Sequence, residues 1–156
     1  MTAPADRLRR ALRLAARLAL GGVFVYLGLA KAVDPVGFLK LLRQFDLLPG
    51  ALALNLVAAV LPWCEVLFGV ALVAGVRVPS AALLLLIMLA AFTVVVVARA
   101  WSMHQAGGLP LCAMRFDCGC GGGEVAICPK VLQNLVLMAL AGFLVVTPAE
   151  GREVAR

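Results

Sequence analysis

The feature that most constrains this chain is a run without charge. Residues 78–98 carry no charged side chain, and between Asp46 and Arg77 the only charged residue is Glu65. A helix needs about 20 mostly apolar residues to cross a bilayer, so each stretch is long enough to span. With 64% hydrophobic residues and a mean hydropathy of +1.06, the 156-residue chain has more apolar surface than a soluble domain of this size can bury. The sequence predicts an integral membrane protein.

Four such runs predict an all-α fold, a four-helix transmembrane bundle forming one domain over residues 1–156. The expected spans are residues 10–31, 51–76, 78–100 and 129–147, with a cysteine- and glycine-rich loop over residues 101–128. The sequence Ala30-Lys31-Ala32 resembles a signal-peptide cleavage site after an Arg-rich start. Lys31 within that motif and the three later spans favour an uncleaved first helix instead.

A short amphipathic helix is expected between the first two spans. Apolar residues recur there at helical spacing among charged ones, at Phe38, Leu41, Leu42 and Phe45. Asp34-Pro35 supplies an N-cap and a first turn, and Pro49-Gly50 ends the segment. This pattern is typical of a helix that lies in the membrane interface.

The net charge of +6 predicts an orientation rather than nucleic-acid binding. Five arginines precede the first apolar run, and Arg77 lies in the short turn between the second and third spans. Basic residues favour the cytoplasmic side and can extend to lipid headgroups. We therefore expect a bacterial inner-membrane protein with both termini in the cytoplasm and the cysteine loop outside, where disulfides persist.

Four of the five cysteines lie in the cysteine loop, at Cys112, Cys118, Cys120 and Cys128. A disulfide closing the small Cys118-Gly119-Cys120 ring would be strained, and strained exposed disulfides tend to exchange. Cys128 precedes Pro129 at the start of the last span, where a helix N-terminus stabilises a thiolate. The residues therefore suggest Cys118 and Cys120 as an exchanging pair, with Cys128 or Cys112 as the relay.

Two other interpretations of the four cysteines stay open. Four cysteines allow three pairings, and two static disulfides would only fasten the loop. Four thiolates could also bind Zn²⁺ or Cu⁺, although the C-x5-C-x-C-x7-C spacing lacks the paired CxxC of structural zinc sites.

The second candidate site is Glu65, which the sequence places near the middle of the second span. A carboxyl group at that depth is costly and normally faces a partner or water. Possible partners are Tyr26, Thr93 and Lys31, and Pro62 could kink the helix beside it. Glu65 then serves as a proton relay or, with Trp63 and Tyr26, forms a pocket for a membrane quinone; alternatively it only pins the helices together.

Two smaller predictions concern the same helices. Cys64 is expected to be a small buried residue, too far from the cysteine loop for direct exchange. Five glycines are expected at close-packing positions between helices, namely Gly21, Gly22, Gly28, Gly69 and Gly75.

Three motifs in order resemble one family. They are Gly28-x-x-Lys31 with Asp34-Pro35 and Phe38, Leu61-Pro62-Trp63-x-Glu65 with Gly69 and Gly75, and Cys118-Gly119-Cys120-x-Gly122. Together they resemble the DoxX-like membrane proteins, and among them the methylamine-utilisation type called MauE. Gly121 departs from the aromatic residue expected after the CxC, and Cys112 and Cys128 are additions to the pattern.

The resemblance implies a four-helix redox-associated membrane protein. MauE is linked to maturation of methylamine dehydrogenase, whose small subunit is rich in disulfides. DoxX relatives are linked to thiol partners and to quinone-linked oxidation. For this chain it implies thiol–disulfide exchange with an extracytoplasmic thiol-containing client or a thioredoxin-like partner. The alternatives are a non-catalytic scaffold within a maturation complex and a metal-handling membrane protein.

Overall fold

The computed structural model describes residues 3–44, 50–107, 110–117 and 124–147. Its long helices are α1 (Ala3–Val33), α3 (Ala51–Ala74), α4 (Val78–Gly107) and α5 (Ile127–Val146). All four are long and apolar enough to cross a membrane. The predicted all-α membrane fold is confirmed.

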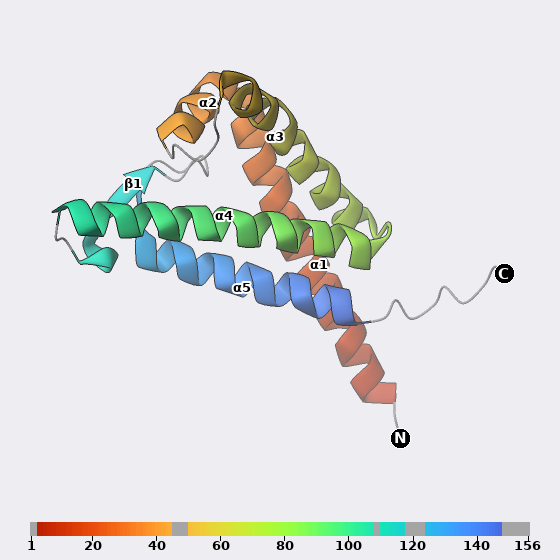
Figure 1. Ribbon diagram of the computed structural model, residues 1–156. Coiled ribbons are helices and arrows are strands. Elements are labelled where there is room, and N and C mark those ends of the chain that lie inside the picture. Colours follow the sequence, from red (N-terminus) through yellow and green to blue (C-terminus); the bar gives the residue numbers. More distant parts are fainter. Residues whose placement is uncertain (1–2, 45–49, 108–109, 118–123, 148–156) are drawn as a thin grey trace.

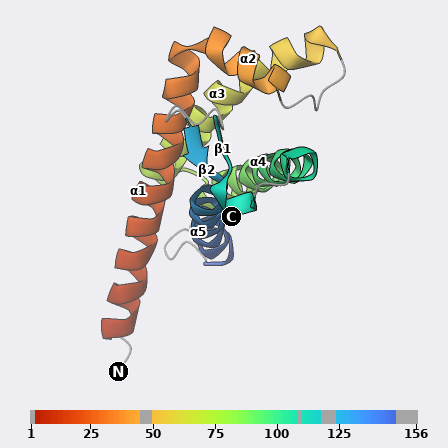
Figure 2. The same cartoon turned by 90° about the vertical axis from the view of Figure 1, so that its left-hand side faces the viewer.

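The four long helices form two antiparallel pairs that cross each other. Helix α1 packs along α3, and α4 packs along α5 (Figure 1). Figure 2 looks almost along α4 and α5 while α1 stands upright, so the two pairs are far from parallel. Where they meet, α1 and α3 contact α5 and α4 through an apolar core that includes Leu20, Leu72, Leu85 and Leu144.

Glycine allows the close approach of α1 to α3. A methyl group added at Gly21 would lie 2.7 Å from the carbonyl oxygen of Gly69, and one added at Gly28 would lie 2.7 Å from that of Pro62. The predicted close packing is confirmed at these three glycines. It is wrong for Gly22, where an added methyl group would meet nothing within 4 Å. Helix α3 continues through Pro62 without interruption.

Gly75 has a different role, because it ends α3 in the left-handed conformation with φ of 78°. Arg17 of α1 reaches this end, and its guanidinium donates to the carbonyls of Leu72 and Val73 at 3.0 and 3.2 Å. The last carbonyls of a helix lack intrahelical donors and carry partial negative charge. Arg17 was expected to extend to lipid headgroups; it instead caps the neighbouring helix.

The short helix α2 (Pro35–Gln44) follows α1 as predicted. The Asp34 carboxylate accepts a hydrogen bond of 2.9 Å from the backbone N–H of Gly37, which caps the helix. Phe38 and Leu41 are buried against the bundle. The predicted apolar position Phe45 lies outside the described residues.

The segment after α4 contains structure that the sequence did not predict. Helix α4 extends to Gly107, beyond the expected end of the span at residue 100. A 3-10 turn, η1 (Leu111–Ala113), leads into strand β1 (Arg115–Asp117), which pairs antiparallel with β2 (Glu124–Ala126). Met114 and Ile127 pack on Ala100, so this hairpin is fixed on the ends of α4 and α5.

The glycine packing gives a matched test. We expect Gly21→Ala to destabilise the protein by about 1–3 kcal/mol, since the new methyl group meets a backbone carbonyl that cannot easily move. Gly22→Ala makes the same change in helix propensity without the collision. Unfolding in mixed micelles measures both; equal effects at the two positions would contradict the packing described here.

Candidate polar cavity and cysteine site

Glu65 is paired with Lys31 in a buried ion pair between α3 and α1. The Lys31 Nζ lies 2.6 Å from both carboxylate oxygens of Glu65. Each residue is only 7% exposed. Phe38 of α2 covers the ammonium group, with 5.6 Å from Nζ to the ring centroid. Of the three partners considered from the sequence, Lys31 is the one the structure shows.

Thr93, another candidate partner, bonds elsewhere. Its hydroxyl donates to the carbonyl of Leu89 at 2.7 Å and accepts 2.9 Å from the Nδ2 of Asn134. This contact joins α4 to α5, and both residues are buried. A buried contact between polar side chains therefore joins the helices within each pair.

A cavity of about 40 Å³ lies where the four long helices meet. Its polar lining comes from three helices: Lys31 of α1, Glu65 of α3, and Lys130 and Asn134 of α5. Its apolar walls come from α1, α3, α4 and α5, and include Phe24, Leu27, Leu61, Met88, Phe92 and Leu137. We call this space the polar cavity.

Lys130 and Asn134 are site residues that were not predicted from the sequence. Lys130 is 7% exposed and Asn134 is 1% exposed, and both are in a helix otherwise composed mainly of apolar residues. Polar side chains inside a membrane span are costly and tend to face the bundle interior. The cost that predicts a buried, partnered position for Glu65 therefore predicts the same for Lys130 and Asn134.

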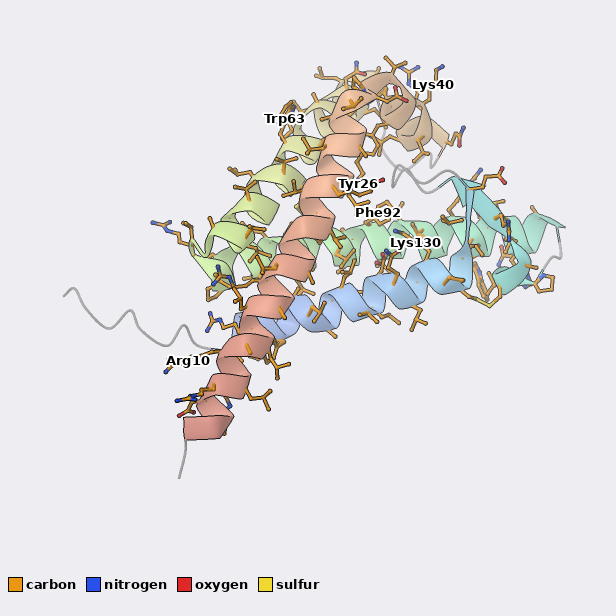
Figure 3. The ribbon with its side chains drawn as sticks, turned by 180° about the vertical axis from the view of Figure 1, so that it is seen from behind. Arg10, Tyr26, Lys40, Trp63, Phe92 and Lys130 are labelled. Atoms are coloured by element: carbon orange, nitrogen blue, oxygen red, sulfur yellow. A yellow bond between two sulfur atoms is a disulfide. The ribbon has the colours of Figure 1, made fainter. Side chains whose placement is uncertain are left out.

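Tyr26 and Trp63 do not line the polar cavity. Tyr26 is 65% exposed and Trp63 is 62% exposed. Figure 3 shows Trp63 on α3, on the side away from Lys130 and Phe92. The structure thus brings Glu65 together with Lys31, Lys130 and Asn134, and not with the two aromatic residues that were expected to form a quinone pocket with it.

Cys112 and Cys128 form a disulfide with a Cα–Cα distance of 5.0 Å. The bond joins η1 to the first turn of α5, next to the strand pair. Cys112 is exposed and Cys128 is half-buried. Cys118 and Cys120, the expected exchanging pair, lie outside the described residues.

Two further expectations concern cysteine. Cys64 carries a free thiol and is half-buried on α3 rather than fully buried. Within the part of the chain that the structure describes, which leaves out Cys118 and Cys120, no three histidine, cysteine or acidic side chains are grouped as a metal site requires. In the disulfide state Cys112 and Cys128 have no thiolate to offer a metal.

A comparison with protein-family models matches residues 9–147 to the family described as methylamine utilisation protein MauE. The chain belongs to the MauE family. No curated protein sequence and no solved structure matches it. Within this MauE-family chain the match covers α1 from Arg9 onward, all of α3, α4 and α5, the polar cavity and the Cys112–Cys128 disulfide.

The ion pair can be tested by a double-mutant cycle. We expect Glu65→Gln to destabilise the protein by about 3–5 kcal/mol, because it leaves the Lys31 ammonium buried without its partner. Lys31→Met in the same chain should recover most of that loss. Thermal or chemical unfolding in micelles measures the cycle, with Lys40→Met on the exposed face of α2 as control. Additive effects at positions 31 and 65 would contradict the pairing.

Proposed function

We propose that this MauE-family membrane protein exchanges thiols and disulfides to support the maturation of an extracytoplasmic partner. The observation that supports it best is the Cys112–Cys128 disulfide, one cysteine of which is exposed beside the first turn of α5. A thiolate can approach an exposed disulfide, and exchange between Cys112–Cys128 and the reduced Cys118–Cys120 pair requires that access. The family description adds a link to methylamine utilisation.

The proposed reaction conserves atoms and electrons. A client thiolate attacks the Cys118–Cys120 disulfide, and the client's second thiol resolves the mixed disulfide. The client leaves oxidised, and Cys118 and Cys120 become a dithiol. The Cys112–Cys128 disulfide then reoxidises that pair by the same two steps. Reoxidation of the Cys112–Cys128 dithiol to the disulfide would release two electrons and two protons, and a membrane quinone would supply the acceptor chemistry for them.

A non-catalytic scaffold is the second candidate, and one observation favours it. The disulfide connects residues whose neighbours Met114 and Ile127 are packed with Ala100 into a small apolar cluster. A bond in such surroundings can fasten the hairpin to α5 without ever cycling. The scaffold would dock a maturation complex on the hairpin, and its disulfide would resist mild reduction.

The proposed location is the bacterial inner membrane, with the hairpin outside and both termini inside. The N-terminal end of α1, the turn between α3 and α4, and the end of α5 lie toward one end of the molecule, whereas α2 and the hairpin lie toward the other (Figure 1). Helix α1 begins among four arginines, Arg7, Arg9, Arg10 and Arg13, and Arg77 lies in the turn. Positive charge at that end supports a cytoplasmic assignment.

The thiol state of the cysteines tests exchange against scaffold. Acid trapping in native membranes, alkylation with a mass tag and mass spectrometry should find both Cys112–Cys128 and Cys118–Cys120 bonds in a mixture that shifts with mild reductant. Replacing Cys118 and Cys120 by Ser should abolish client oxidation, whereas Cys64→Ala should leave it unchanged. Unchanged client disulfide formation in the double Ser variant would refute exchange, and bonds that resist mild reductant would favour the scaffold.

The orientation has its own test. In a chain with Cys64, Cys118 and Cys120 replaced by Ala, K40C places a thiol on α2 and R7C places one at the start of α1, both exposed positions. A membrane-impermeant maleimide should label K40C in spheroplasts, and R7C only after lysis. The reverse pattern would place the hairpin in the cytoplasm.

A further inference from the structure

The buried charges around the polar cavity do not balance. Lys31 and Lys130 supply two ammonium groups and Glu65 supplies one carboxylate, and all three side chains line the cavity at 7% exposure. With all three ionised, 2 − 1 leaves one positive charge in surroundings that are otherwise apolar, apart from Asn134. An uncompensated charge in such a site is costly, so a balancing anion is favoured there.

Among the described residues, Glu65 forms an ion pair with Lys31 and none with Lys130, although the charges of Glu65 and Lys130 attract each other. Both carboxylate oxygens are held at 2.6 Å by Lys31. Within the described residues, the one hydrogen bond of the Lys130 ammonium goes to the neutral Gln133 Oε1 at 3.2 Å, and no carboxylate pairs with it. An ammonium group has three donors, so Lys130 can donate to a further acceptor.

The space beside Lys130 limits the size of that acceptor. About 40 Å³ holds two or three waters, or a group of similar bulk. A small carboxylate, or the carbonyl end of a larger molecule, can place one oxygen in this space. Phe24, Met88 and Phe92 provide apolar contact to the carbon part of either ligand.

We propose that the polar cavity binds one oxygen that is anionic or gains negative charge on reduction, and that this oxygen accepts hydrogen bonds from Lys130. Two sources share this chemistry: a free carboxylate of the size of formate, and the oxygen of a membrane quinone, which gains negative charge on reduction. The Lys31–Glu65 ion pair acts as a positioning element, because the carboxylate that could otherwise form an ion pair with Lys130 is already bonded to Lys31. The site goes beyond the proposed thiol exchange and does not depend on it.

The first measurement uses the unaltered protein in nanodiscs. Saturation-transfer NMR reports whether the formate proton receives magnetisation from protein protons, and a concentration series shows whether the transfer saturates. Thermal unfolding in formate and in gluconate, an anion too bulky for the cavity, provides the second readout. We expect a saturable transfer and a stabilisation by formate that gluconate does not give. A short-chain ubiquinone is then tested for its own stabilisation and for competition with formate.

Three variants locate the site. Lys130→Met keeps the length of the side chain without the charge, and we expect it to weaken binding about ten- to a hundredfold. Lys130→Arg should retain binding, because it keeps a donor and a positive charge. Lys40→Met removes an exposed lysine from α2 and should change nothing. If Lys130→Met fails to fold, the Lys130→Arg chain and the competition on the unaltered protein still report on the site.

The outcomes separate as follows. Saturable formate binding that Lys130→Met weakens supports the site with a free anion as ligand. Ubiquinone binding with the same dependence on Lys130 supports it with the quinone oxygen as ligand. No saturable binding of either probe, or binding that Lys130→Met leaves unchanged, overturns the proposal. None of these readouts requires the cysteines to cycle, so they are independent of the test of exchange.

Discussion

The rest of the structure depends on how a bilayer treats a charge that water cannot reach. Glu65 has to be placed within the bundle, and the Lys31 ammonium lies 2.6 Å from both of its oxygens. That contact requires α1 and α3 to approach closely, which Gly28 permits because any side chain there would collide with the carbonyl of Pro62. Helix α2 follows directly after Lys31 and covers it with Phe38. One polar requirement thus constrains the path of three helices.

Polar contacts also connect the other helices of the bundle. Apolar side chains gain little free energy by leaving lipid to pack on one another, so they do little to fix which helices associate. Lipid chains are as apolar as leucine, so helices in a membrane associate through close packing and hydrogen bonds. Asn134 donates to Thr93 between α5 and α4, and Arg17 donates to the last carbonyls of α3. In both cases a side-chain donor that lipid could not satisfy finds an acceptor within the protein.

The sequence was sufficient to predict the class of fold, because uncharged runs of spanning length have few other uses. It placed α2 from the Asp34 cap and named Lys31 among three partners for Glu65. The sequence did not show how each helix is rotated about its own axis, and therefore which side chains face the bundle. Trp63 is two residues, or about 200°, from Glu65, so burying one exposes the other. Gly21 and Gly22 differ by about 100°, and only Gly21 faces α3.

Two features could not be read from local patterns at all. The β1–β2 hairpin depends on pairing across the loop, and its short strands have too few residues to show an alternating pattern. The burial of Lys130 depends on the meeting of all four helices, although a lysine near the start of a span normally extends to the interface. Tertiary contacts decided both, and the charge count that makes the polar cavity unusual follows from them.

The first turn of α5 connects the disulfide to the polar cavity, because Cys128 and Lys130 both lie in it. Reduction of the disulfide would remove the covalent link between η1 and this turn. One turn further along, Asn134 holds α5 to Thr93 through a buried hydrogen bond that contains no thiol. Val131 also packs on the cluster formed by Met114 and Ile127. These contacts of α5 contain no thiol, so the position of α5 on α4, and with it the placement of Lys130 and Asn134 around the cavity, does not depend on the disulfide alone.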